Sequence, residues 1–304
     1  MSGGVENQQA VNAGTSELRA VRRSGVLTIY TPESPLKAPF QLVSQILREI
    51  WQRRELTLIL LQRDLKAQFR QSLLGYAWLV LPPLINALFW TLMHTQEILR
   101  VSDSDSYPAF VLVGTTIWAA FAATLSAPSD VIQANREVFV KLNVPVESFI
   151  LAGAGRAIFN LMVTSAVLLP LLLWQGIQLR YSMLLFPFAA GSAMLSAFTI
   201  GMALAPVGAL YSDLRNALTP LLNVLMFTAP VVFPVPEGNG VLAGIVRWSP
   251  LTPAIALCRD VLLTGHTTWL MSTLLWVIVN LSMLLLAFVG LRIARPHIIA
   301  RMGM

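Results

Sequence analysis

The sequence predicts an all-α polytopic membrane protein with six transmembrane helices. Of its 304 residues, 56% are hydrophobic and only 12% are charged, whereas soluble domains have about 25% charged residues. The mean hydropathy is +0.67. Six apolar runs approach the roughly 20 residues that cross about 30 Å of hydrocarbon. A soluble domain of this length cannot bury so much apolar surface, so lipid is the expected solvent for much of the chain.

The predicted spans lie within residues 74–291, which we treat as the transmembrane domain. Residues 1–40 are expected to form a partly disordered cytoplasmic tail. They contain no apolar stretch typical of a cleavable signal peptide. Residues 292–304 are expected to form a short cytoplasmic tail. The predicted spans are residues 74–94, 108–127, 149–174, 183–210, 217–235 and 269–291.

Basic residues predict which ends of the spans lie inside. Sixteen of the 21 Lys and Arg residues lie on flanks that are cytoplasmic if both termini are inside, and four lie on the opposite flanks. The remaining one, Arg156, lies within the third span. The positive-inside rule therefore favours this orientation. The net charge of +6 reflects topology, and no nucleic-acid partner is expected.

The segment of residues 41–73, before the first span, is predicted to be an amphipathic helix on the inner membrane surface. Its apolar residues recur at intervals of three and four from Leu42 to Phe69. Arg63, Lys66 and Arg70 supply positive charge beside this stripe, as in helices that lie on membranes. A generic juxtamembrane anchor would have the same pattern.

The loop between the second and third spans has a helical pattern of its own, over about residues 129–142. A short helix that projects into the cytosol is suited to docking a partner, although a solvated connector has the same pattern. Its charged residues are Asp130, Arg136, Glu137 and Lys141.

The region of about residues 236–267, before the last span, is moderately apolar but interrupted by charges and prolines. Charged residues such as Arg259 make a full crossing costly. We therefore expect two short re-entrant or interfacial helices after Pro234, with Trp248 near a break at Pro250 and Pro253.

Several kinds of chemistry are excluded by absent motifs. None of the three lysines follows a glycine, so the chain has no P-loop for ATP phosphates. A single cysteine, Cys258, permits no disulfide within the chain, and three scattered histidines give no metal-site pattern. No catalytic residue is assigned, and no cofactor or metal is expected on this chain. An intramembrane enzyme acting on lipid-linked sugars is a remote alternative, and a passive channel is another.

Two further groups of residues have alternative interpretations. Arg156 either attracts an anionic substrate or headgroup, or extends towards the inner surface from a position near the end of its helix. Five aromatic residues within the spans either line a path on which sugar rings stack or contact lipid and core. They are Phe89, Trp90, Trp118, Phe121 and Phe227.

An ordered set of motifs resembles the permease, or transmembrane, subunits of the type-2 ABC exporter family, in the branch that exports O-antigen and capsular polysaccharides. The resemblance extends over roughly residues 27–304. No single motif carries it, but the order and spacing agree. The motifs are residues 62–78 followed by Leu81-Pro82-Pro83, residues 107–115, 135–147 and 211–215, and Ser249-Pro250-Leu251-Thr252-Pro253.

The resemblance implies roles for the three segments outside the spans. Residues 41–73 would be the interface helix, residues 129–142 the coupling helix, and residues 236–267 periplasmic gate helices. It also implies a homodimer in the bacterial inner membrane, with two separate ATP-binding subunits that hold ATP and Mg²⁺. The expected substrate is a polyprenyl-diphosphate-linked polysaccharide, most often O-antigen. Wall teichoic acid and capsular polysaccharide are the alternative cargoes.

The chain departs from the family pattern at two positions. Family members often have Phe-Pro-Arg-Glu after the coupling helix, whereas this chain has Val144-Pro145-Val146-Glu147. The usual asparagine before Pro-Leu-Thr-Pro is replaced by Ser249. Any role of that arginine must therefore be absent here or filled by another residue.

Overall fold

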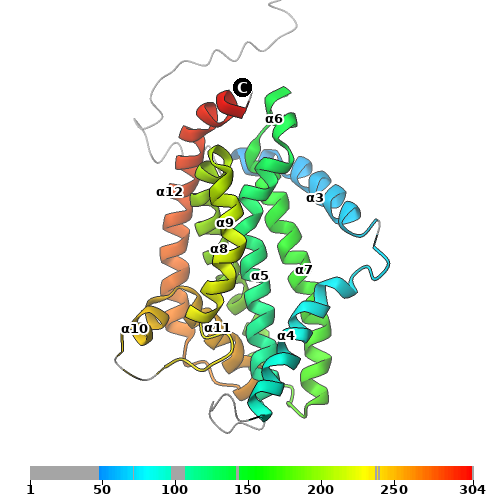
Figure 1. Ribbon diagram of the computed structural model, residues 1–304, viewed down its shortest axis with the longest axis vertical. Helices are drawn as coiled ribbons and strands as arrows, with labels where there is room; N and C mark the ends of the chain where they lie inside the picture. The colour runs from blue at the N-terminus through cyan, green and yellow to red at the C-terminus, as the bar shows by residue number, and fades with distance from the viewer. Residues whose placement is uncertain are drawn as a thin grey trace, which may run out of the picture. The chain divides into compact units, whose positions relative to one another are not determined.

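A computed structural model of the chain describes residues 48–70, 72–96, 107–141, 144–236, 238 and 240–302. Over these residues the chain is helical and contains no strand (Figure 1). This confirms the predicted all-helical class for the described part. The predicted N-terminal tail and residues 41–47 of the predicted amphipathic helix lie outside the described residues.

Four described helices are long and apolar enough to cross a membrane. They correspond to the second, third, fourth and sixth predicted spans. A chain with four such helices is a multi-pass membrane protein. The four are α5 (Tyr107–Ala134), α7 (Val146–Trp174), the 3₁₀ turn η2 (Tyr181–Leu185) together with α8 (Phe186–Leu210), and α12 (Leu270–Met302).

The first and fifth predicted spans are shorter helices. Helix α4 (Ala77–Thr95) is apolar over Ala77–Met93. Helix α9 (Ser212–Leu225) has 14 residues, or about 21 Å, and is followed by the 3₁₀ turn η3 (Met226–Thr228). Ala229 is then extended, as expected for a residue that precedes a proline. The fifth predicted span is therefore not one continuous helix, and six crossings stay a prediction.

Helix α5 is the centre of the packing. It contacts α4, α7, α8 and α9, and its buried residues include Tyr107 and Ile117. One apolar cluster joins α4, α5, one end of α7, α8, α9, residues 229–232 and residues 251–262; we call it the outer core because it lies towards the end that is predicted to be outside. A second cluster joins α3 (Arg54–Phe69), the opposite ends of α5, α7 and α8, and α12; we call it the inner core.

The segments outside the spans lie at two opposite ends of the helix bundle. Helix α3 packs against α7, with Leu60 buried. It lies at the same end as α6 (Arg136–Lys141), whereas α10 (Val241–Trp248) and α11 (Leu251–Arg259) lie at the other end (Figure 1). The break between α10 and α11 falls at Ser249 and Pro250, as the prolines predicted.

A glycine permits close approach of α8 to α5. A Cβ atom at Gly201 would overlap the carbonyl oxygen of Leu125. Gly191, earlier on the same helix, has open space around the position of a Cβ. The small residues of α8 therefore differ in role, because only some of them lie where two backbones meet.

We predict that Gly201→Ala lowers the stability of the protein and that Gly191→Ala does not. The added methyl group at residue 201 must push α8 away from α5, which costs about 1–3 kcal/mol. At residue 191 alanine meets no neighbour and favours the helix by up to about 1 kcal/mol. Thermal unfolding in detergent should show a lower Tm for Gly201→Ala alone. Equal Tm values for the two variants would contradict this packing.

Candidate functional site

Helix α6 is a separate helix of six residues. It lies at the same end of the helix bundle as α3. The predicted helix of residues 129–142 was wrong in extent, because residues 129–134 continue α5 and Leu142 lies outside the described residues. The break comes at Asn135, whose side-chain amide donates a hydrogen bond to the carbonyl oxygen of Val131. Asparagine competes in this way for backbone groups and so disfavours a continuous helix.

The four predicted docking residues are all exposed at this end. Lys141 Nζ lies 3.3 Å from Glu137 Oε2, one turn apart on α6. Asp130 lies on the last turns of α5, and Arg136 begins α6. A cluster of both charge signs on a short projecting helix can form ion pairs with a partner protein.

The opposite face of α6 is anchored in the inner core. Phe139 is buried, and its ring centroid lies 5.0 Å from that of Phe149 at the start of α7. The guanidinium carbon of Arg63, on α3, lies 5.9 Å from the same Phe149 ring. Because packed interiors are nearly incompressible, a displacement of α6 must move the ends of α3 and α7 that meet at Phe149.

An ionic contact that sequence reasoning missed joins three segments at this end. Arg292 Nη2, on α12, lies 2.6 Å from Glu49 Oε2, and Arg292 Nε lies 3.7 Å from Glu147 Oε1. Glu147 is buried at the start of α7. The partners are far apart in sequence, so no local pattern could pair them. Arg292 thus places an arginine beside Glu147, next to Val146, the position at which the resemblance leads us to expect an arginine.

The four cations predicted to attract a diphosphate lie at or near α3. Arg63, Lys66 and Arg70 follow one another at intervals of three and four, and all are exposed. Arg63 is also paired with Asp64 at 2.8 Å. Arg156 is partly buried on α7.

The neighbours of Arg156 place it on the side of α7 that meets α3. A Cβ atom at the adjacent Gly155 would lie 3.2 Å from Leu61 of α3. Phe159, one turn further along α7, has its ring centroid 6.2 Å from that of Tyr76. The ring of Tyr76 lies 4.3 Å from that of Phe69 at the end of α3. The surface of α3, the connection to α4 and this side of α7 therefore form one basic and aromatic region.

The predicted path aromatics separate into two groups. Phe89, Trp90 and Phe227 form an edge-to-face series, with centroids 5.4 Å and 6.1 Å apart. Phe89 and Phe227 are more than half exposed. Trp118 and Phe121 stack on each other but are buried in the outer core. Within a single chain, the first group alone offers aromatic surface to a ligand.

The region before α12 contains a buried arginine. Arg259 was predicted to lie in the gate region as a charge that makes a full crossing costly, and its side chain is buried at the end of α11. Arg259 Nε donates to the carbonyl oxygen of Phe110 at 3.1 Å, and Nη1 donates to that of Pro230 at 2.6 Å. Nη2 donates to the carbonyl oxygen of Val231. The guanidinium also stacks on the Phe110 ring, with Cζ 3.4 Å from its centroid.

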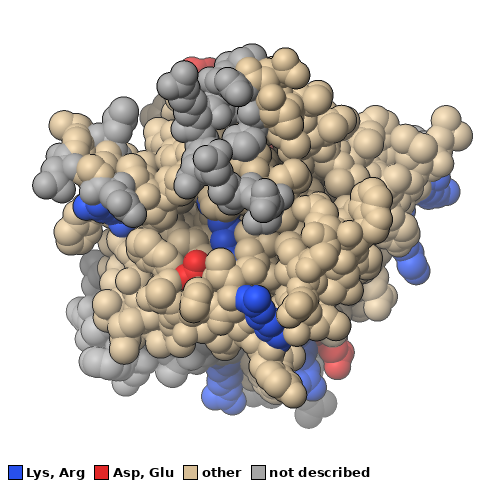
Figure 2. All heavy atoms as spheres, turned by 90° about the horizontal axis from the view of Figure 1, so that it is seen from below, with Lys and Arg blue, Asp and Glu red and all other residues tan. Residues whose placement is uncertain are grey.

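The other predicted residues of this region lie at the ends of α10 and α11. Pro250 precedes α11, and Pro253 lies in its first turn, where a proline removes no helical hydrogen bond. Trp248 is exposed at the end of α10. Figure 2, a view onto this end, shows charged side chains few and scattered among uncharged ones.

Asp260 follows Arg259 and begins η4, the π-helical turn Asp260–Thr264. Partial burial raises the pKa of its carboxyl, although the hydroxyl of Thr268 donates to it and His266 lies nearby. An acid whose pKa is raised on folding stabilises the fold below its ordinary pKa. That contribution is lost as pH rises through the raised pKa.

Within the described residues, no three His, Cys, Asp or Glu side chains are grouped so that they could hold a metal ion. The surfaces above therefore offer charge, aromatic faces and hydrogen-bond donors rather than metal ligands.

Comparisons with known proteins identify relatives over most of the chain. Residues 55–263 match the profile of the ABC-2 type transporter family. The O-antigen export system permease protein RfbA of Myxococcus xanthus is 25% identical over 191 residues, which cover 63% of this chain and 73% of that protein. The polysialic acid transport protein KpsM of Escherichia coli is 25% identical over 223 residues, 67% of this chain and 80% of its own. A Klebsiella pneumoniae O-antigen export permease is 21% identical over 243 residues, 79% and 90% of the two chains.

We predict that Arg259→Met lowers the free energy of unfolding by at least about 3 kcal/mol, because three carbonyl oxygens lose a charged donor. Arg247→Met is the matched control. Arg247 lies on α10, is exposed, and donates to a single carbonyl, that of Pro236. Its loss should cost about 0.5 kcal/mol or less, as for other surface changes. Thermal and denaturant unfolding in detergent measure both, and equal losses would show that Arg259 is no more important than a surface arginine.

Proposed function

The chain belongs to the ABC-2 type transporter family, and from this premise we propose that it is the permease subunit of an ATP-driven exporter of a lipid-linked polysaccharide. The family is one of membrane subunits rather than enzymes. Multi-pass insertion follows from the four long apolar helices. The observation that carries the proposal is the match to polysaccharide export permeases over about two thirds or more of the chain.

The proposed partner is a separate ATP-binding subunit. This chain has no P-loop, so the energy of ATP must come from another polypeptide. We propose that two such subunits dock on a homodimer of this chain in the bacterial inner membrane, with both termini of each permease in the cytoplasm. The positive-inside distribution of Lys and Arg supports this orientation.

In the proposed mechanism, α6 receives the motion of the ATP-binding subunits. Its exposed pair Glu137 and Lys141 provides a charged docking face. Its buried Phe139 transmits a displacement to Phe149 of α7 and to the rest of the inner core. Rigid-body movement of packed helices between two arrangements is a known way for a bound ligand to act at a distance.

The proposed cargo is a polysaccharide attached to a polyprenyl diphosphate, with O-antigen the first candidate. The names of the relatives support a polysaccharide cargo. Lys66, Arg70 and Arg156 supply positive charge near the inner surface for the diphosphate. The exposed rings of Phe89 and Phe227 supply faces on which sugars can stack.

We predict that exchanging the α6 pair, Glu137→Lys with Lys141→Glu, weakens assembly with the ATP-binding subunit. The exchange keeps the net charge and an ion pair one turn apart, so α6 should still form. Reversed charges at a complementary interface should reduce copurification and stimulated ATP hydrolysis by about tenfold. The measurement is copurification with the cognate ATP-binding subunit in mild detergent, followed by an ATPase assay.

The control for this variant is Arg180→Glu, a charge reversal at the opposite end of the described chain. Arg180 is exposed beside η2. It should leave assembly and hydrolysis unchanged. If the α6 exchange also has no effect, α6 is not the docking element.

We predict that Arg156→Gln weakens binding of a polyprenyl diphosphate about fivefold, since one cation near a membrane surface contributes about 1 kcal/mol to attraction of an anionic lipid. Binding to undecaprenyl diphosphate in nanodiscs measures this directly. Lys66→Gln should have a similar effect, whereas Arg247→Gln, at the other end, should have none. Full export and unchanged lipid affinity in Arg156→Gln would remove this residue from the proposed substrate site.

A further inference from the structure

A lateral groove lies between α7 and α8. Both helices pack against α5 but make little contact with each other, so α5 forms the floor between two walls. The groove has a volume of about 740 Å³. Its lining is almost wholly apolar, and the polar side chains in it are Thr124 and Ser165. Thr124 donates to its own helix at Ala120.

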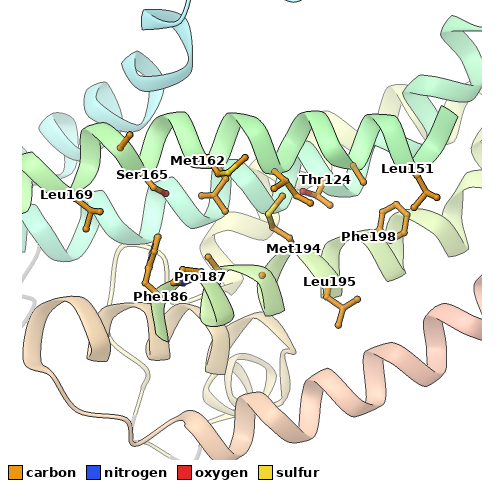
Figure 3. Close-up of a pocket in the computed structure, with 16 residues that line it drawn as sticks. Thr124, Leu151, Met162, Ser165, Leu169, Phe186, Pro187, Met194, Leu195 and Phe198 are labelled. Atoms are coloured by element: carbon orange, nitrogen blue, oxygen red, sulfur yellow. The ribbon is translucent and has the colours of Figure 1, made fainter. Parts of the chain in front are cut away.

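The groove has defined ends. Figure 3 shows Phe186 and Leu169 at one end and Phe198 and Leu151 at the other. Both phenylalanines are buried. They are twelve residues apart on α8, which corresponds to about 18 Å along the helix. The hydrocarbon of one bilayer leaflet is about 15 Å deep, half of the full thickness. Leu151 and Leu169 are eighteen residues apart on α7, which corresponds to about 27 Å. The groove is therefore longer than one leaflet is deep, and it runs along the helices.

The middle of the groove is wide because its walls carry small residues. A Cβ at Gly191 would meet no atom within 4 Å. Ala166, on the opposite wall, is exposed. The groove is thus open at its centre and bounded at its ends by aromatic rings.

Both walls belong to helices that are long and apolar enough to cross a membrane. A lateral opening between such helices faces hydrocarbon rather than water. If the groove stayed empty there, the lining atoms would lose their dispersion contacts. A flexible, unbranched hydrocarbon chain can fill it without burying a polar group of its own. A charged or sugar-bearing ligand would find few hydrogen-bond partners there, among them the buried hydroxyl of Ser165, which has no partner among the described residues.

We propose that this groove binds one acyl chain of a membrane phospholipid lengthwise, as a resident lipid between α7 and α8. The length of the groove favours an acyl chain over a polyprenyl chain, which is much longer than the distance between Phe186 and Phe198. The site lies apart from α6 and from the basic region at α3. It does not rest on the proposed export function.

The test uses the full chain in nanodiscs with phosphatidylethanolamine that carries a diazirine in the middle of one acyl chain. After illumination, mass spectrometry should find adducts concentrated on groove residues such as Met162 and Leu195. Labelling of the exposed face of α12, at residues such as Ile278, provides the level for ordinary lipid contact. Equal labelling of the groove and α12 would overturn the proposal.

Gly191→Phe should fill the groove and reduce its labelling to the α12 level. The matched control is Gly290→Phe, since Gly290 is also a helical glycine with no atom within 4 Å of an added Cβ, but lies on the exposed face of α12. It should leave groove labelling unchanged. Ala166→Phe, which fills the groove from α7, is a second variant in case Gly191→Phe folds poorly. Unchanged groove labelling in a folded filling variant would overturn the proposal.

Two further arms distinguish other occupants. A diazirine-bearing polyprenyl phosphate at the same mole fraction should label the groove less than the phospholipid. Stronger labelling by the polyprenyl probe would overturn the proposal and show that the groove binds the carrier lipid instead of an acyl chain. Crosslinks between two copies of the chain through groove residues would overturn the proposal and show that the groove is an interface between copies. Because no arm requires an ATP-binding subunit or export, failure here is separable from failure of the proposed function.

Discussion

The buried guanidinium of Arg259 is the interaction on which the outer end of the molecule depends. It donates to carbonyl oxygens of Phe110 on α5 and of Pro230 and Val231 after η3. The segment after η3 is not helical, so its carbonyls lack partners within their own helix. An arginine can satisfy several such groups at once because its five N–H donors are held in a plane. Irregular backbone at this depth is tolerated since Arg259 pairs it.

This arrangement also explains a local constraint on α5. A Cβ at Gly114 would overlap both the Arg259 guanidinium and the Val231 carbonyl. Only glycine leaves room there for the side chain and the backbone it binds. The proline after η3, the glycine on α5 and the arginine on α11 therefore act together, although the glycine is more than a hundred residues from the other two.

The sequence predicted features that depend on local composition. Apolar runs identified α5, α7, α8 and α12 because hydropathy is a property of the segment itself. Pro250 located the break between α10 and α11 for a similar reason. Features that depend on distant partners were missed. The partners of Arg259 could not be predicted because its carbonyl acceptors lie on other elements, and nothing near Arg292 in the sequence points to Glu49 or Glu147.

The exposure of the aromatic residues also could not be predicted from the sequence. Trp118 and Phe121 could not be separated from Phe89 and Phe227 by sequence, because all four lie in apolar runs. Their difference arises from which face of each helix a neighbour covers, and that is decided by tertiary packing. The extent predicted for the helix of residues 129–142 was wrong for a different reason, which lies at Asn135. The side-chain amide of Asn135 donates to the carbonyl oxygen of Val131, one turn earlier, and α5 ends there. The spacing of apolar residues continues past this position and gives no sign of the break.

The two ends of the helix bundle differ in how much free energy is needed to separate their polar contacts. At the outer end, separating Arg259 from its carbonyls leaves buried polar groups unpaired, which costs about 1–3 kcal/mol for each group. At the inner end, Arg292 and Glu49 are partly exposed, and such ion pairs contribute about 0–1 kcal/mol since water can replace either partner. A displacement applied at α6 therefore meets less resistance from polar contacts at its own end than at the end that holds Arg259. The apolar contacts of the inner core join α3, α6, α7 and α12, so we expect these segments to move together when α6 is displaced.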